Sequence, residues 1–281
     1  MRAIAKTFPF FLPIFFLLYL GSCQTEPLQM RKKRIARPEA ITRKHEDKLY
    51  VFQEPQWQEN VRYPWENSHQ LNFPKITKEF FRCRGSALNP VRIAQEGNGL
   101  MRYYDCSGTS RHSLPLREGK EFVYPILIDL LNYLQIATGK KVVITSGHRC
   151  PEHHDYVDQN REDRCSKHMV GAEVAFYVQG MEAEPLRIIE LIMAYYRQEA
   201  RYQGQPAFTD FLRYDTSKTN VSTPPWYNKE IFIKLYQKHE GRNLDNRHPF
   251  AYISLQVRYD WETQEKVSFS WDAAQKNFLR W

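Results

Sequence analysis

Apolar and polar positions follow regular periods between residues 122 and 281 and predict a mixed domain there. After Phe122, leucines recur at the spacing of a helix, and Gly139 follows where that helix should end. The other expected elements are a strand over 141–145, a loop over 146–166, a strand over 172–178, a helix opened by Pro185, and strands over 230–236, 252–259 and 266–271. Helices beside a small, mostly antiparallel sheet make an α+β domain, which is the predicted fold class.

The segment of residues 49–121 is harder to divide into elements. It holds many aromatic residues, but polar residues interrupt them and neither a helical nor a strand period is sustained. We therefore expect a loop-rich lead-in that packs on the main domain of residues 122–281.

The N-terminus has the pattern of an exported protein. Residues 8–20 are almost wholly apolar, but a run of this length is too short to cross a hydrocarbon core of about 30 Å as a helix. Arg2 and Lys6 precede the run, and small residues follow it. Residues 1–22 are therefore expected to be a secretory signal peptide.

The end of this signal resembles a bacterial lipobox. Small residues in Leu20-Gly21-Ser22 would let the peptidase reach the bond before Cys23, whose thiol would then carry the lipid. Gln24 is not the aspartate type of signal for retention in the inner membrane. We expect an exported, lipid-anchored envelope protein, in the outer membrane facing the periplasm rather than in the inner membrane.

The net charge of +8 is concentrated near the N-terminus. Residues 1–22 carry two of these charges and residues 24–48 a net four, so residues 49–281 hold only two. This near balance gives no support to phosphate binding, and no nucleic-acid partner is expected. Residues 23–48 are expected to form a basic tether, in which Arg31–Arg34 contacts anionic lipid or is simply solvated.

The cysteine content agrees with export. Once Cys23 carries the lipid, four cysteines remain, and an even number in an oxidising compartment suggests two disulfides. Proximity in the sequence favours the pairs Cys83–Cys106 and Cys150–Cys165 among the three possible pairings. The alternative is that all four remain free thiols.

Two motifs flank the expected loop over 146–166. Ser146-Gly147-His148-Arg149 directly follows one strand, and Ser166-Lys167-His168-Met169-Val170-Gly171 leads into the next. Together they resemble the zinc D-alanyl-D-alanine peptidases, whose fold is shared with hedgehog domains. That family reads Ser-Gly-aromatic-Arg and then Ser-x-His-x-x-Gly-x-Ala-x-Asp. The resemblance covers about residues 122–260.

The resemblance implies roles for individual residues. Arg149 would hold the terminal carboxylate of a substrate through paired hydrogen bonds, with Ser166 beside it in substrate binding. His168 would bind zinc. The family's third ligand is a late histidine, often with an acidic general base three residues before it, and His248 and Asp245 have this spacing.

The metal site departs from the family at its second ligand. The aspartate expected seven residues after the first histidine is Ala175, which has no lone pair to give. Glu173 lies on the same strand face, about 6.6 Å away, and would replace the aspartate only if the backbone shifted. A second alignment places the third ligand at Ser254 instead of His248, but we prefer His248.

Two functions from different classes follow. One is a zinc-dependent peptidase that acts on peptidoglycan stem peptides, with zinc held by His168, His248 and Glu173. The other is a catalytically inactive binder or scaffold of the cell envelope, which keeps the fold and holds a stem peptide through Arg149. Ala175 favours the second function, because a catalytic zinc requires three protein ligands and an open position.

Overall fold

The computed structural model describes residues 73–96, 99–108, 111–158 and 165–281. The expected signal peptide, the expected lipidation site Cys23, the expected tether and residues 49–72 lie outside these ranges. The helices are α2 (Pro125–Thr138), α3 (Pro151–Val157), α4 (Pro185–Gln198), α5 (Pro206–Thr209) and α6 (Trp271–Lys276), with 3-10 helices η1 (Lys78–Phe81), η3 (Lys167–Val170), η4 (Ala200–Tyr202) and η5 (Thr216–Lys218). The strands are β1 (Arg92–Glu96), β2 (Gly99–Tyr103), β3 (Leu116–Arg117), β4 (Lys120–Glu121), β5 (Val142–Ser146), β6 (Glu173–Val178), β7 (Leu212–Arg213), β8 (Trp226–Tyr227), β9 (Ile231–Tyr236), β10 (Tyr252–Val257), β11 (Tyr259–Asp260) and β12 (Glu265–Lys266). None of these helices is long and apolar enough to cross a membrane.

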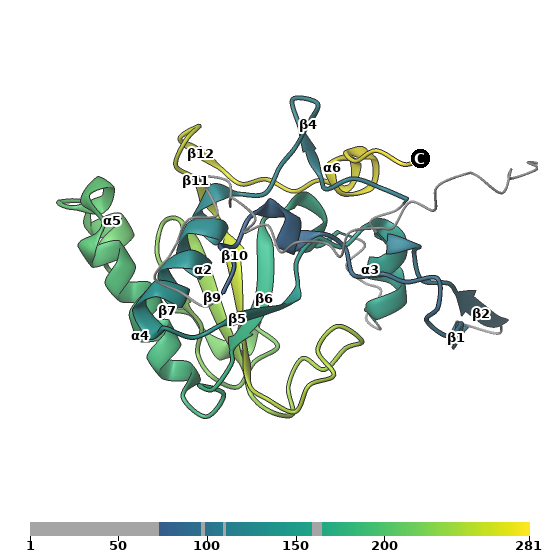
Figure 1. Cartoon of the computed structure of the whole chain (residues 1–281), viewed down its shortest axis with the longest axis horizontal. Helices are drawn as coiled ribbons and strands as arrows, with labels where there is room; N and C mark the ends of the chain where they lie inside the picture. Colours follow the sequence, from purple (N-terminus) through teal and green to yellow (C-terminus); the bar gives the residue numbers. More distant parts are fainter. Residues whose placement is uncertain (1–72, 97–98, 109–110, 159–164) are drawn as a thin grey trace, which may run out of the picture. The chain divides into compact units, whose positions relative to one another are not determined.

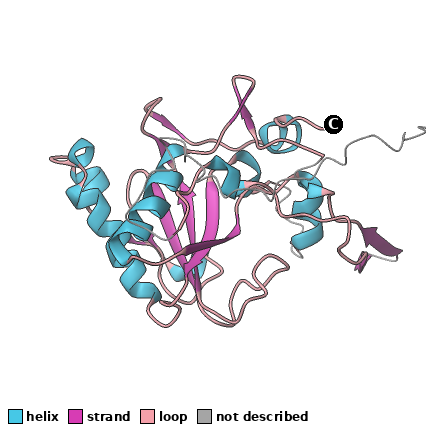
Figure 2. Cartoon of the chain, in the orientation of Figure 1, coloured by secondary structure: helices cyan, strands magenta, loops and turns pink. Residues whose placement is uncertain are grey.

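The centre of the fold is a six-stranded sheet in the order β5-β6-β10-β9-β8-β7. Every neighbouring pair of its strands is antiparallel. Helices α2 and α4 lie beside each other against this sheet (Figure 1), and Figure 2 shows the sheet with its accompanying helices. The predicted class, α+β with a mostly antiparallel sheet, is confirmed.

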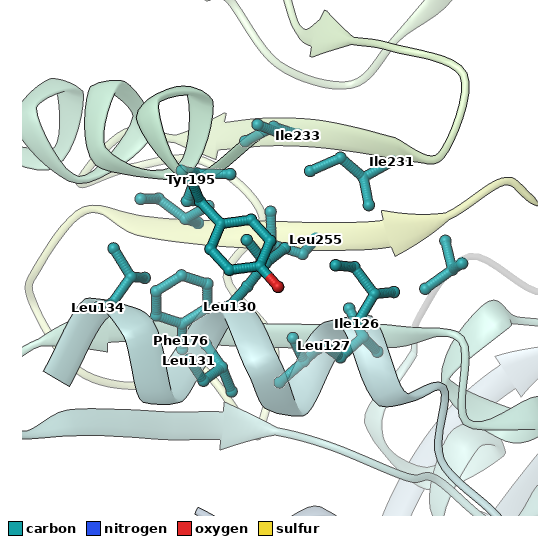
Figure 3. Close-up of a cluster of buried hydrophobic side chains, with 14 of the residues drawn as sticks. Ile126, Leu127, Leu130, Leu131, Leu134, Phe176, Tyr195, Ile231, Ile233 and Leu255 are labelled. Carbon is teal, nitrogen blue, oxygen red and sulfur yellow. The ribbon is translucent and has the colours of Figure 1, made fainter. Parts of the chain in front are cut away.

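The main core lies between the two long helices and one face of the sheet. Helix α2 begins at Pro125, whose fixed backbone angle suits the first turn, and ends at Gly139 in the left-handed region, with φ of 63°. Its leucines recur every three or four positions, so they line one side of the helix. Figure 3 shows them against Phe176 and Leu255 of the sheet and Tyr195 of α4. This packing fixes the sheet relative to both helices.

The central strands alternate between two environments. In β6, Val174, Phe176 and Val178 point into the core, whereas Glu173 and Ala175 lie on the opposite face. Strands β9 and β10 repeat this alternation in register with β6. The face opposite the core therefore carries the polar residues from which the candidate site is built.

Most elements expected for the main domain are present within a few residues of their predicted bounds. The strand expected over 266–271 is wrong, because β12 ends at Lys266 and α6 begins at Trp271. The Ser270 hydroxyl accepts a hydrogen bond from the backbone N–H of Ala273, as an N-cap residue does. This local cap converts the end of the expected strand into a helix.

The expected loop over 146–166 contains the additional helix α3. Pro151 occupies its first position, and the Cys150 sulfur accepts a hydrogen bond from the backbone N–H of His153. The helix start is therefore encoded in the pair Cys150-Pro151, which lies in the segment expected to be a disulfide-bonded loop.

The described part of the lead-in contacts the main domain at the end of β5. Ile76 and Phe81 are fully buried in the main core, and the backbone N–H of His148 donates to the Phe81 carbonyl oxygen at 2.6 Å. Gly147 is required at this contact, because a Cβ there would lie 2.6 Å from the same oxygen. The lead-in thus packs against the segment that carries the first motif and stabilises it.

Candidate functional site

A polar cavity of about 330 Å³ lies on the sheet face opposite the main core. Its walls come from β6, β9 and β10, from both predicted motifs, and from the loop of residues 237–251, which extends past the sheet (Figure 1). The lining residues that bear on its chemistry are Arg149, Ser166, His168, Glu173, Lys234 and Ser254. The structure thus brings the two sequence motifs to one cavity.

Arg149 is held from the rear by two side chains. Its Nε donates hydrogen bonds to the Ser146 hydroxyl and to Oδ2 of Asp245, each at 2.8 Å. Burial alone would raise the pKa of Asp245, but the neighbouring Arg149 charge holds that pKa well below its usual range. No hydrogen bond from the terminal guanidinium nitrogens to another described residue is present, so these nitrogens remain available to an anion in the cavity.

A second cation supports Asp245 from its other oxygen. His153 Nε2 lies 3.0 Å from Asp245 Oδ1, and His153 Nδ1 lies 2.6 Å from Asp105 Oδ1. Burial alone would lower the pKa of His153, but its hydrogen bonds to the two carboxylates raise that pKa to about 10. The imidazolium therefore links Asp105 of the lead-in to Asp245. This position makes Asp245 a support for Arg149, and Asp245 does not line the cavity itself.

His168 and Glu173 face each other inside the cavity. His168 Nδ1 lies 2.7 Å from the Gly147 carbonyl oxygen and donates to it, so Nε2 faces Glu173 Oε1 at 3.6 Å. Burial lowers the pKa of His168 to about 4, which leaves the ring neutral at pH 7. Burial alone would raise the pKa of Glu173, but the neighbouring imidazole of His168 and hydrogen bonds from Ser254 at 2.6 Å and Gln256 at 3.0 Å lower it.

The second motif forms the turn that presents His168. The Ser166 hydroxyl accepts a hydrogen bond from the backbone N–H of His168 at 3.3 Å and begins the short helix η3. Gly171 ends η3 with φ of 70°, and a Cβ there would lie 2.9 Å from the Phe122 carbonyl oxygen. Ser166 and Gly171 therefore serve the local geometry, and Ser166 also lines the cavity.

The cavity lacks the ligand set of the family's zinc. Ala175 stands at the aspartate position and lies directly opposite Ser254 in the sheet, the residue that the second alignment placed at the third ligand. Glu173 reaches His168 from the same strand face, which gives two metal-binding groups. Among the described residues, no set of three histidine, cysteine or acidic ligands includes His168. These residues do not fit a catalytic zinc, which needs three protein ligands.

His248, the predicted third ligand, lies in a different environment. Its ring packs 4.9 Å from the Tyr177 ring and 6.0 Å from the Phe250 ring, measured between centroids. It is not among the residues that line the cavity. The structure therefore brings Arg149 and His168 together, as predicted, and leaves His248 in an aromatic cluster.

The cysteines gather differently from the expected pairs. All four described cysteines are free, so both predicted disulfides are absent. Cys83 and Cys106 do lie together, with sulfurs 3.6 Å apart, but Cys150 joins them instead of Cys165. Two groups of described residues could hold a metal ion: Cys83, Cys106, His112 and Cys150, and Asp105, Cys106 and His153.

Comparisons with protein-family models, with curated proteins and with solved structures found no match. The resemblance to zinc D-alanyl-D-alanine peptidases therefore rests on the two motifs and on the order of the elements around them.

Proposed function

We propose that this chain is an envelope lipoprotein whose DD-peptidase-like domain binds peptidoglycan stem peptides without hydrolysing them. The observation that carries the proposal is the environment of Arg149. Ser146 and Asp245 accept hydrogen bonds from its Nε, the residue lines the cavity, and its terminal nitrogens have no hydrogen-bond partner among the described residues. A planar guanidinium presented in this way can take a carboxylate through two parallel hydrogen bonds. A peptide with a free C-terminal carboxylate is the corresponding ligand.

The assignment of the named fold is part of this proposal. In its support, the first motif follows β5, the second precedes β6, and both reach one cavity on an antiparallel sheet. The proposal also places the chain outside the cytoplasm, exported and anchored through Cys23. An anchored domain near the cell wall would meet stem peptides as its natural ligands.

Binding without hydrolysis is favoured by what the cavity contains. Ala175 stands at the expected aspartate position and His248 lies outside the cavity, so only His168 and Glu173 of the predicted ligands line it. The Glu173 carboxylate can accept a hydrogen bond from a peptide N–H, and Lys234 adds a positive charge to the wall. These groups suit recognition of a polar peptide end.

The test compares two forms of one stem peptide that ends in D-alanyl-D-alanine. Calorimetry with the free acid is expected to give measurable binding, and the C-terminally amidated peptide is expected to bind much more weakly, because it presents no carboxylate to Arg149. Arg149→Ala should abolish the difference between the two peptides. Arg187→Ala is the matched control, because Arg187 is exposed on α4 and does not line the cavity. Equal affinity of the parent chain for both peptides would contradict the proposal.

A second candidate is the zinc peptidase itself, and the observation that favours it is the 3.6 Å approach of His168 Nε2 to Glu173 Oε1. It expects release of D-alanine from the same peptide, with loss of release in His168→Ala. If the parent chain cleaves and His168→Ala does not, the peptidase replaces the binder as the function of this cavity.

A further inference from the structure

Three sulfur atoms and one imidazole meet in the interior, where the lead-in approaches α3. The Cys83 and Cys106 sulfurs lie 3.6 Å apart, and these atoms, the Cys150 sulfur and a ring nitrogen of His112 all lie within 4.8 Å of one another. In a tetrahedral site with Zn–S bonds of about 2.3 Å, neighbouring sulfurs are about 3.8 Å apart. A disulfide requires about 2.05 Å, and three sulfurs can form only one. The spacing fits a shared metal ion.

His112 has the orientation of a metal ligand. The residue is only 3 % exposed, and its Nδ1 lies 3.0 Å from the Ser113 carbonyl oxygen. Its Nε2 is buried and has no hydrogen-bond partner among the described residues. A proton donated from Nδ1 to the carbonyl leaves the lone pair on Nε2, which is the arrangement found in metal-bound histidines. A metal ion would satisfy this buried ring nitrogen, which no described residue pairs with.

The backbone around the sulfurs is arranged to receive them. The N–H of Gly108 donates to the Cys106 sulfur, and the N–H of His153 donates to the Cys150 sulfur, each at 3.4 Å. A Cβ at Gly85 would collide with the Cys106 sulfur, so this position accommodates only glycine without a shift. Donated N–H groups favour the thiolate form that binds metal.

We propose that the sulfurs of Cys83, Cys106 and Cys150 and the Nε2 of His112 bind a structural zinc ion. Three thiolates and one imidazole form an established tetrahedral ligand set for zinc, and soft sulfur ligands disfavour magnesium and calcium. Four protein ligands leave no open position for a substrate. All four residues are buried, so the ion is enclosed.

The ion joins three segments that are distant in the sequence and are adjacent to the cavity network. Cys150 directly follows Arg149, and Cys106 directly follows Asp105, whose carboxylate contacts His153. Zinc therefore holds the lead-in against the start of α3 and fixes both ends of the chain of contacts behind the Arg149 guanidinium. Its role is to position the cavity wall.

The first experiment measures metal in the full chain carrying Cys23→Ser, purified under reducing conditions without chelator. Elemental mass spectrometry is expected to find about one zinc per chain. After exchange for Co²⁺, the visible spectrum is expected to show a tetrahedral ion with thiolate-to-metal charge transfer. A chain that contains no zinc and takes up neither Zn²⁺ nor Co²⁺ would overturn the proposal, as would a Cys83–Cys106 disulfide in chain isolated under these conditions.

Single substitutions then identify the ligands. Cys150→Ser is expected to lose most of the bound metal, whereas Cys165→Ser is the matched control and should retain it, because Cys165 is outside the cluster. His112→Ala should lose metal, and His112→Cys should regain it with a shifted Co²⁺ spectrum. Equal metal content in the Cys150→Ser and Cys165→Ser chains would overturn the assignment. If Cys150→Ser does not fold, the Co²⁺ spectrum of the parent decides.

Discussion

The two buried polar centres of this molecule differ in how their side chains are assembled. In the cavity, His168 and Glu173 lie close together in the sequence, but Ala175 stands at the expected aspartate position and the preferred third ligand, His248, lies outside the cavity. In the cysteine cluster, four ligands from three separate segments lie around one point. Two motifs that resemble those of a known family therefore mark the position of the cavity, while the four candidate metal ligands come from segments that no short motif connects.

The two centres also differ in access. Polar side chains line a cavity of about 330 Å³, whereas Cys83, Cys106 and Cys150 are each no more than 5 % exposed. An open centre is suited to exchange a ligand, and an enclosed centre is suited to hold a permanent one. Four predictions test this contrast, in order of decreasing effect.

The largest effect is expected from metal removal. A ligand that binds only the folded chain stabilises it by about 4.1 kcal/mol when its free concentration is a thousand times its Kd. We expect the free energy of unfolding of the metal-free chain to rise by a corresponding amount when zinc is restored at such an excess. Cys150→Ser should show no such rise. If zinc did not change the stability of the parent chain, the cysteine cluster would not be a permanent metal site, and the contrast with the cavity would be lost.

The next effect is a loss of stability at alkaline pH that originates at His153. Because its pKa is raised to about 10 in the folded chain, its contribution is complete below the unfolded value of about 6.5 and is lost as pH rises through about 10. The contribution amounts to several kcal/mol, because a shift of one pKa unit corresponds to about 1.4 kcal/mol. Denaturant unfolding of the parent and of His153→Gln at several pH values measures it. The two curves should converge as pH rises, and parallel curves would contradict the assignment of the imidazolium.

A smaller effect is expected at Arg149 in ligand binding. Hydrogen bonds to charged groups contribute about 1.5–3 kcal/mol, so Arg149→Ala should weaken binding of the free-acid peptide by roughly ten- to a hundredfold. Arg149→Lys should restore only part of this, because an ammonium cannot present the paired geometry. Calorimetric titration of the three chains provides the comparison. If Arg149→Lys restored the full affinity, Arg149 would act by simple charge attraction and not through paired hydrogen bonds from its guanidinium.

The smallest effect is expected at Cys165. It lies outside the cluster and is free, so Cys165→Ser should change stability by no more than about 0.5 kcal/mol. Denaturant unfolding of Cys165→Ser and of the parent, measured under the same conditions, tests this prediction. A large loss would show that Cys165 has a structural partner and would weaken its use as a control.

The fold of the main domain was accessible from the sequence because its periods are strong. The leucines of α2 and the alternating residues of β6, β9 and β10 identify the buried face through spacing alone. Helix α3 and the start of α6 were missed because each depends on a single capping side chain, Cys150 or Ser270, within a polar segment. A cap leaves no periodic signal.

The candidate site was accessible only in part. Motifs on either side of one loop pointed to Arg149 and His168, and the structure places both residues in the lining of one cavity. Nothing local predicts that His153 joins two carboxylates from distant segments, or that His112 meets three cysteines. The even number of cysteines and their spacing in the sequence favoured disulfides. Neither observation indicates that the fold brings Cys150 next to Cys83.

Because residues of the central strands alternate between the core and the cavity, substitutions on the two faces of the sheet have different consequences. Core residues such as Val174 and Phe176 carry the packing, while Glu173, Ala175 and Ser254 project from the other face of the sheet. Exchanges at the projecting positions need not alter the hydrophobic interior. A lineage can therefore discard a ligand, or acquire one, without altering the main hydrophobic core of the sheet.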